Sequence, residues 1–144
     1  MEIHELVVGP LKTNCYIVTS DMNHAVIIDP GFDAEKIIAK IRELGAKPKF
    51  ILLTHGHLDH TCGAPYVQKK YGGKIVIGKE DAYVLKEYKF SDDTPDYKEA
   101  FAVCEPDILL TDETELQFGS KTIRIMYTPG HTLGEVCYII DNLC

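Results

Sequence analysis

Three histidines and an aspartate stand close together in the run Thr-His-Gly-His-Leu-Asp-His, which ends at His60. The chain has only 6 histidines, so this concentration is unusual for its composition. In an extended segment, side chains two residues apart point to the same side. His55 and His57 can therefore bind one metal ion, while Asp59 and His60 turn toward a neighbouring position. Gly56 allows the backbone to bend between the first two histidines.

These residue types favour zinc chemistry. Imidazole nitrogen is a common zinc ligand, and a catalytic zinc ion keeps one coordination position open for water. His55 and His57 supply two ligands, so a third must come from elsewhere in the chain. His131 is the best candidate, because it stands in a Thr-Pro-Gly-His-Thr loop that follows an apolar strand. Three imidazoles would leave one tetrahedral position for a water molecule, and the metal would lower the pKa of that water toward neutrality.

The first half of the chain predicts an α/β arrangement that places the histidine run at the end of a strand. Residues 50–53 form a short apolar run after a strand and a helix, which is typical of a buried strand. The polar segment 54–60 leaves that strand at its carboxyl end, where ligand sites of α/β folds lie. The helix before it has apolar positions at helical spacing, with Asp33 as a possible cap and Gly45 as its end.

The other expected elements follow from apolar runs and turn residues. Strands are expected at residues 14–18, 25–28 and 74–77, and helices at 64–71 and 81–88. A long polar loop is expected at 89–106. The C-terminal part predicts a meander of four strands at residues 109–110, 115–118, 121–127 and 136–140. A hairpin turn is expected at residues 118–121.

Composition limits the partners that we expect. The chain of 144 residues suits one domain, spanning residues 1–144, and its formal net charge is −7 with no block of Lys and Arg. Nucleic acids bind through many basic side chains, so a nucleic-acid partner is disfavoured and a small-molecule substrate is expected. No apolar stretch is long enough for a membrane span, and the N-terminus lacks the features of a secretory signal. We therefore expect a cytoplasmic protein without a membrane partner.

The 5 cysteines are odd in number and widely spaced, and no Cys-x-x-Cys occurs. Neither a disulfide framework nor a cysteine zinc site is indicated, so ordinary reduced thiols are expected. A role for Cys62, which follows His60 by two positions, is the lesser alternative.

The run His55-x-His57-x-Asp59-His60 resembles the signature of the metallo-β-lactamase superfamily. Three further segments stand in the order and at the kind of spacing found in its glyoxalase II-like (hydroxyacylglutathione hydrolase-like) branch: Asn14-Cys15-Tyr16, Ile28-Asp29-Pro30-Gly31 and Gly130-His131-Thr132-x-Gly134. The resemblance runs over essentially the whole chain, and its core motif is specific for the superfamily rather than for a substrate.

This resemblance implies an αββα sandwich with a metal site at one edge of its two sheets. By position, it implies that His55, His57 and His131 bind a first metal ion and that Asp59 and His60 belong to a second. It also implies that Asp29 lies near the metals and shapes the site, as carboxylates that orient ligand imidazoles do. One or two zinc ions are the expected cofactor, with iron as the alternative.

The sequence departs from the family pattern at its end. The pattern expects an aspartate that bridges both metals, after an apolar strand and a glycine, and then a last histidine. No glycine precedes Asp141, which is therefore not assigned, and no histidine follows His131. We favour a chain that is part of a longer enzyme, because the strand expected at 136–140 leads into the missing ligand. The alternative is a short form completed by another chain, and a homo-oligomer could then cover the incomplete sandwich.

The leading functional hypothesis is a zinc-dependent hydrolase of a small thioester or ester, similar to glyoxalase II. Hydroxide held by the metal would attack the carbonyl carbon, and Asp59 would help to orient the attacking oxygen. Two alternatives remain open: a mononuclear iron enzyme resembling persulfide dioxygenases, and a metal-binding half-domain without turnover. A β-lactam substrate also stays open, because nothing in the sequence selects the substrate.

Overall fold

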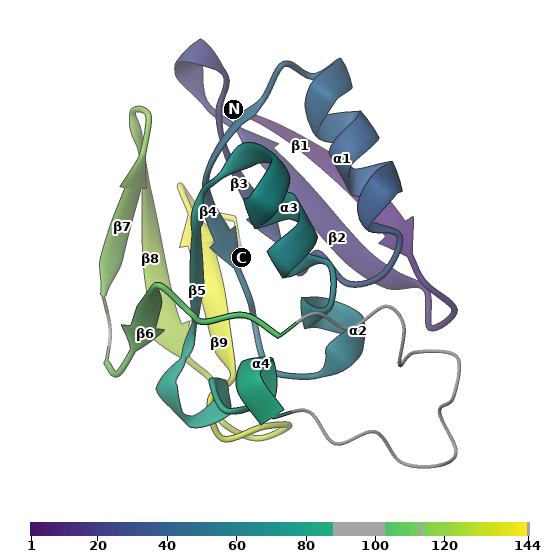
Figure 1. Cartoon of the computed structure of the whole chain (residues 1–144). Coiled ribbons are helices and arrows are strands. Elements are labelled where there is room, and N and C mark those ends of the chain that lie inside the picture. Colours follow the sequence, from purple (N-terminus) through teal and green to yellow (C-terminus); the bar gives the residue numbers. More distant parts are fainter. Residues whose placement is uncertain (88–102, 113, 144) are drawn as a thin grey trace.

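A six-stranded sheet forms the centre of the computed structural model, which describes residues 1–87, 103–112 and 114–143 (Figure 1). Its strands follow the chain in the order β1-β2-β3-β4-β5-β6. The first three are antiparallel, whereas β3, β4, β5 and β6 run parallel to one another. The strands are β1 (Glu2–Val8), β2 (Thr13–Thr19), β3 (His24–Ile28), β4 (Lys47–Leu52), β5 (Lys74–Gly78) and β6 (Ile108–Leu110).

A second, antiparallel sheet contains β7 (Glu115–Phe118), β8 (Lys121–Tyr127) and β9 (Val136–Ile140). These three strands form the expected meander, but the prediction that residues 109–110 belong to it is wrong. Two contacts of Asp107 hold β6 against β5 instead: its backbone N–H donates to Ile75 O (2.9 Å), and its Oδ2 accepts from Ile75 N (2.8 Å). A short apolar run does not specify which strand it pairs with, so the sequence could not show this.

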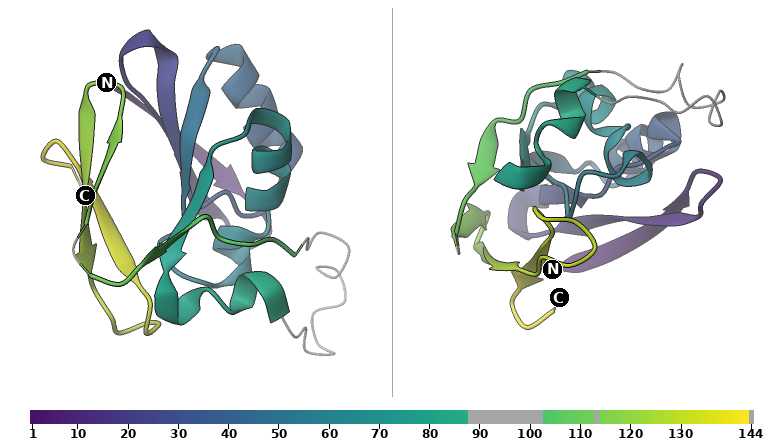
Figure 2. Two further views of the ribbon diagram at one scale, coloured as in Figure 1. Left: turned by 60° about the vertical axis from the view of Figure 1, so that its left-hand side comes forward. Right: turned by 90° about the horizontal axis from the view of Figure 1, so that it is seen from below.

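The helices cover the outer face of the six-stranded sheet, and the three-stranded sheet covers its other face (Figure 2). The long helices are α1 (Ala34–Glu43) and α3 (Ala64–Tyr71), and the short ones are α2 (Leu58–Thr61) and α4 (Val84–Glu87). Two 3-10 turns, η1 (Asp21–Asn23) and η2 (Lys79–Asp81), complete the elements. The chain is therefore a mixed α/β sandwich, and its described residues form the helix–sheet–sheet layers of the expected arrangement.

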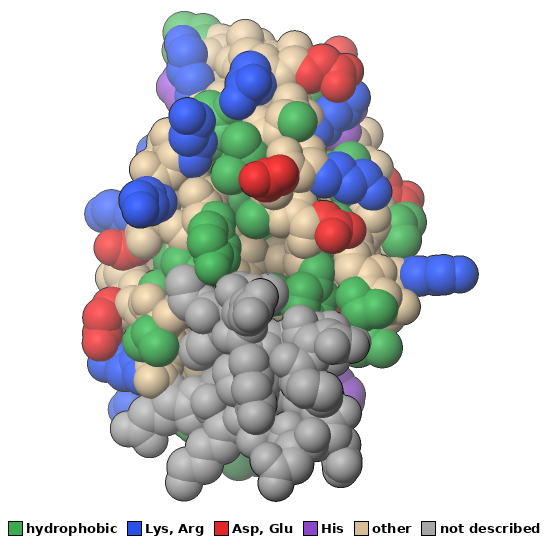
Figure 3. Space-filling model, turned by 45° about the vertical axis from the view of Figure 1, so that its right-hand side comes forward, with side chains coloured by type: hydrophobic (Ala, Val, Ile, Leu, Met, Phe, Trp, Pro, Cys, Tyr) green, Lys and Arg blue, Asp and Glu red, His purple; other side chains and the backbone are tan. Residues whose placement is uncertain are grey.

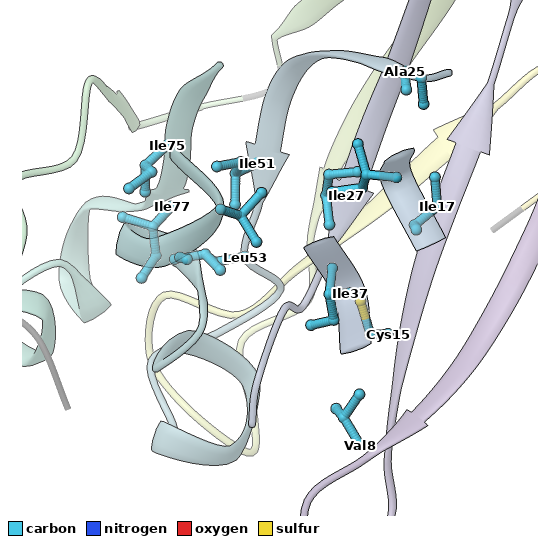
Figure 4. Packing of buried hydrophobic residues seen from close by; sticks show 14 of the residues in the cluster. Val8, Cys15, Ile17, Ala25, Ile27, Ile37, Ile51, Leu53, Ile75 and Ile77 are labelled. Carbon is cyan, nitrogen blue, oxygen red and sulfur yellow. The ribbon is translucent and has the colours of Figure 1, made fainter. Parts of the chain in front are cut away.

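The central strands are buried on both faces, which explains their continuous apolar runs. Ile51 and Leu53 contribute to the core between the sheet and the helices, where Ile37 of α1 also lies (Figure 4). Phe50 and Leu52 point the other way, into the core between the two sheets. Because side chains alternate along a strand, successive residues of β4 pack into the two cores. The strand that leads into the histidine run is therefore held from both sides.

Three local predictions near the helices meet different outcomes. Asp33 does precede α1, but it has a left-handed backbone (φ 56°), and its carboxylate accepts the N–H of Gly9 instead of capping the helix. Gly45, with φ 58°, ends α1 as predicted.

The helix expected at 81–88 is divided between η2 and α4, because the side chain of Asp81 forms hydrogen bonds to neighbouring loops. Tyr88 and most of the loop expected at 89–106 fall outside the described residues.

The surface carries charges of both signs. On the face seen in Figure 3, acidic side chains lie among the Lys and Arg side chains. In the described part of the chain, no helix combines the length and the apolar character that a membrane crossing requires.

The core between the sheets supplies a first stability prediction. Phe118 is 0% exposed there and lies in one cluster with Leu52 and Ile123. Replacing it with alanine should lower the free energy of unfolding by about 3–5 kcal/mol, because the truncation removes buried apolar area and leaves a cavity. Urea denaturation measures the change. Tyr83→Ala is the matched control: this aromatic is 65% exposed, and its truncation should cost no more than about 0.5 kcal/mol. Equal losses in both variants would contradict the assignment of Phe118 to the core.

Candidate metal centre

Three parallel strands end at the same edge of the six-stranded sheet and deliver polar residues to it. Asp29 follows β3, the histidine run follows β4, and Asp81 follows β5. This edge is where ligand sites of α/β folds lie. The backbone bends at residues 54–56 and is extended at His57, after which α2 begins at Leu58. The expectation of an extended segment up to residue 60 is therefore wrong: Asp59 and His60 lie on a helical turn, which the backbone bond from His60 N to His57 O closes (3.0 Å).

The second sheet brings His131 to this edge. Its loop connects β8 to β9, and β9 is attached to the exit of β4 by two hydrogen bonds. The backbone N–H of Val136 donates to Thr54 O (2.9 Å), and the hydroxyl of Tyr138 donates to Leu53 O (2.8 Å). These contacts position a residue from the C-terminal part of the chain beside the histidine run.

The rings of His55, His57 and His131, here called the histidine group, meet at this edge. Ring centroids lie 4.8 Å apart for His55 and His57, 4.6 Å for His57 and His131, and 5.0 Å for His55 and His131. Nδ1 of His57 lies 3.0 Å from Nε2 of His131. One ring nitrogen from each residue lies within 4.8 Å of the other two, so the three side chains could hold one metal ion. Their role as ligands stays a prediction.

The surroundings of one nitrogen atom in the histidine group show whether a metal ion fits there. Nε2 of His55 is buried and has no hydrogen-bond partner among the described residues, whereas Nδ1 of the same ring lies 2.9 Å from Thr54 Oγ1. A buried polar atom without a partner is costly, and a metal ion would satisfy it. Burial and then the charge of His60 lower the pKa of His55, against the opposing charge of Asp29, and so favour the neutral ring that metals bind. Three imidazoles suit zinc, so the residues present fit the ion that the sequence predicts.

Asp29 organises the neighbouring position. It is 5% exposed, and its Oδ1 accepts the backbone N–H of Thr54 (2.8 Å). Its Oδ2 accepts the hydroxyl of Thr54 (2.7 Å) and lies 2.9 Å from Nδ1 of His60. Asp29 is thus more than a turn-forming residue, because it binds the residue before His55 and orients the ring of His60.

Asp59 and His60 lie together beside the histidine group. Nε2 of His60 is 3.3 Å from Oδ2 of Asp59, and its ring centroid is 4.2 Å from that of His55. Thr13 of β2 donates its hydroxyl to the same Oδ2 (2.7 Å). Burial alone would lower the pKa of His60, but its hydrogen bond to Asp29 and the two carboxylate charges outweigh that effect and raise it. The two residues are placed for a second metal position, which remains a prediction.

A pocket of about 470 Å³ opens beside these residues, between the two sheets. Asp29, His55 and His60 line its polar part. Its apolar walls come from both sheets and include Tyr16, Val18, Ile28, Val136 and Ile140. The site therefore adjoins a largely apolar space.

Several residues considered from the sequence lie elsewhere. Asp141 is exposed, and its carboxylate binds Lys121 (2.8 Å). Cys62 is buried and lines a separate pocket with Gly31 and Tyr66, and burial raises the pKa of its thiol to about 12. Neither residue faces the histidine group.

The sequence missed three contributors to the site: Thr13, Thr54 and Asp81. The position of Thr54, next to His55 at the start of the histidine run, was a usable sign, because metal-binding imidazoles are commonly held by a hydrogen bond to their second ring nitrogen. The hydrogen bond of Thr13 joins residues 46 positions apart, and those of Asp81 join residues 25 to 53 positions apart. Bonds of such separation leave no local pattern in the sequence.

Comparisons with known proteins show the family to which the chain belongs. The family model of the metallo-β-lactamase superfamily matches residues 8–143. Hydroxyacylglutathione hydrolase GloC of Haemophilus influenzae is 34% identical, over 96% of this chain and 66% of that protein. The probable metallo-hydrolase YqgX of Bacillus subtilis is 29% identical, over 99% of this chain and 67% of that protein. The chain thus spans about two thirds of the length of these relatives.

Solved structures show the same likeness. The BLEG-1 B3 metallo-β-lactamase has a TM-score of 0.85 at 31% identity, over 96% of this chain and 66% of that one. The subclass B3 enzyme BJP-1 of Bradyrhizobium japonicum has a TM-score of 0.78 at 27% identity, over 96% of this chain and 53% of that one. With the family model matching nearly its whole length, the chain belongs to the metallo-β-lactamase superfamily.

Proposed function

We propose that this chain carries the metal-binding part of a metal-dependent hydrolase that acts on a small thioester or ester. The observation that carries the proposal is the histidine group, in which Nε2 of His55 is buried and unpartnered within the described structure. Membership of the superfamily supports the hydrolase class. The name of the Haemophilus influenzae relative, a hydroxyacylglutathione hydrolase, supports an acyl-glutathione thioester as the substrate class.

In this proposal, His55, His57 and His131 would hold a zinc ion, each with one ring nitrogen. Bound there, zinc supplies Lewis acidity, which lowers the pKa of water and polarises a carbonyl group. His55 is held for this role by Thr54, and His57 and His131 are exposed to solvent.

Asp59 and His60 have the second role in the proposal. Asp59 orients the attacking water and accepts its proton, while Thr13 fixes one of its oxygens by a hydrogen bond (2.7 Å). Asp29 fixes His60 in turn, so that Nε2 of its ring stays directed toward Asp59. These contacts keep both side chains in place for a second ion or for the reacting water.

The test is a thioester assay with the purified chain. We expect an acyl-glutathione thioester to be cleaved when zinc is supplied, with the activity abolished by a chelator and restored by added zinc. His57→Ala should reduce the rate to that of zinc in buffer. His24→Ala is the control, because His24 lies on β3 and its ring contacts the backbone of Asp21 instead of the histidine group.

Three outcomes of this assay separate the candidate functions. Cleavage that survives the chelator would contradict a metal-dependent reaction. Stoichiometric zinc without any cleavage would support the metal-binding half-domain in place of a hydrolase. Iron in the purified protein together with oxygen consumption would support the dioxygenase alternative.

A further inference from the structure

Asp81 is a buried carboxylate for which the proposed reaction has no use. It is 5% exposed and ends η2, directly after β5. Its Oδ2 accepts hydrogen bonds from Gly56 N (2.9 Å) and from Thr132 Oγ1 (2.6 Å). Its Oδ1 accepts the backbone N–H of Gly134 (2.9 Å). Bonds to an ionised carboxylate are among the stronger hydrogen bonds in proteins, so this residue holds its three donors firmly.

The donors belong to the two loops that carry the histidine group. Gly56 lies between His55 and His57, and Thr132 follows His131 directly. One side chain therefore joins the exit of β4 to the β8–β9 loop, although these segments come from different sheets. Two of its three hydrogen bonds come from backbone N–H groups of these loops, and the third comes from the hydroxyl of Thr132.

The backbones of these loops lie so close to η2 and to the start of α4 that side chains at the two glycines would not fit. A Cβ atom at Gly134 would stand 2.7 Å from the backbone nitrogen of Asp81 and 2.8 Å from its Cγ. A Cβ atom at Gly56 would stand 2.5 Å from a methyl carbon of Val84. Both loops are thus seated against the segment that contains Asp81, and they cannot shift toward it.

We infer that Asp81 is a positioning residue that sets the separation of His57 and His131 before a metal ion binds. This inference rests on the proposed metal centre. The two rings approach to 3.0 Å between Nδ1 and Nε2, and Asp81 is bonded within one residue of each of them. A preformed arrangement of ligands raises affinity, because the ion does not have to order the loops itself.

The test measures zinc affinity by competition with a chromophoric chelator in four proteins: the wild-type chain, D81N, H131A and the double variant. Asparagine keeps the size of the side chain but offers N–H in place of one oxygen, so at least one donor loses its acceptor. We expect D81N to weaken zinc binding by about 10-fold, the lower end of the losses seen when a group that supports metal ligands is removed. In the H131A background the same change should have little effect, because the ligand that Asp81 positions is already gone.

A second readout needs no metal. Hydrogen exchange at the amide of Gly56 or of Gly134 in the metal-free chain should be faster in D81N, because these two N–H groups bind different oxygens of Asp81 and asparagine keeps only one of them. If D81N does not fold, T132V removes only the hydroxyl donor and tests the same link in milder form. Asp107→Asn is the control, because Asp107 accepts a backbone N–H near the start of β5 (2.8 Å), away from both loops. It should leave zinc affinity unchanged.

The outcomes separate this inference from the proposed function. If H131A weakens zinc binding and D81N does not, the role of Asp81 is contradicted and the metal centre stands. An equal loss from D81N in both backgrounds would show a general structural role and also overturn the inference. If H131A leaves zinc affinity unchanged, the metal centre fails, and the inference fails with it.

Discussion

Replacing His131 with alanine is expected to weaken zinc binding by more than about 100-fold, since losing a ligand should exceed the 10–100-fold cost of losing a group that merely supports one. His131 provides one of the three nitrogens of the histidine group and lies 3.0 Å from His57. Without it, two imidazoles remain, which is too few for a stable tetrahedral site. Chelator competition measures the affinity directly.

The loss of zinc binding should also appear in the stability that zinc adds to the folded protein, measured by urea denaturation with and without zinc. Zinc at 100 times its dissociation constant stabilises a folded protein by about 2.7 kcal/mol, provided that it does not bind the unfolded chain. That gain should be present in the wild-type chain and in the His24→Ala control, and absent in His131→Ala. Because His131 is exposed, the metal-free variants should unfold at nearly the same urea concentration as the wild-type chain. A stabilisation by zinc that persists in His131→Ala would place the ion somewhere else.

Replacing Asp29 with alanine is expected to be the most damaging single change at the site in the absence of metal. The carboxylate is buried, and it accepts bonds from Thr54 N, Thr54 Oγ1 and the ring of His60. Buried donors left without an acceptor cost about 1–3 kcal/mol each, so a loss of roughly 3–5 kcal/mol of unfolding free energy is expected. The left-handed backbone of Asp29 (φ 48°) adds to the cost, because alanine tolerates it less well.

Two variants separate these contributions. Asp29→Asn keeps the backbone preference and one acceptor oxygen, so its loss should be smaller, about 1–3 kcal/mol. Asp33→Ala is the matched control, because Asp33 has the same left-handed backbone (φ 56°) but is exposed and accepts a single bond from Gly9. Urea denaturation of the metal-free proteins ranks the three. If Asp33→Ala destabilises the chain as much as Asp29→Ala, the backbone conformation rather than the hydrogen-bond network explains the effect.

Elements with a continuous signal along the chain could be predicted from the sequence. Helix α3 spans Ala64–Tyr71 as expected, because Pro65 starts it and a Gly-Gly pair follows its last turn. β4 was expected as a buried strand, and its burial on both faces explains the unbroken apolar run that ends at Leu53. The meeting of His131 with the histidine run was expected because both segments leave strands at their ends.

Features that depend on distant partners could not be predicted. β6 pairs with β5 because of Asp107, and the helix expected at 81–88 is interrupted because Asp81 reaches two other loops. The start of α2 at Leu58 likewise changes how Asp59 and His60 are presented. For β6 and for the segment at Asp81, the local residue pattern allowed more than one conformation, and a contact far along the chain selected between them.

The closeness of His57 and His131 spans 74 positions of the chain and bridges two separate sheets. An ion bound between them would act as a removable cross-link of long sequence separation, comparable with a disulfide that closes a large loop. Unlike a disulfide, however, the ion would leave the unfolded chain, so its effect would fall on the folded state, in which it joins the two loops. The ion would therefore bind after the two sheets have docked, because only then do the two rings lie together, and its withdrawal would remove one connection between the sheets.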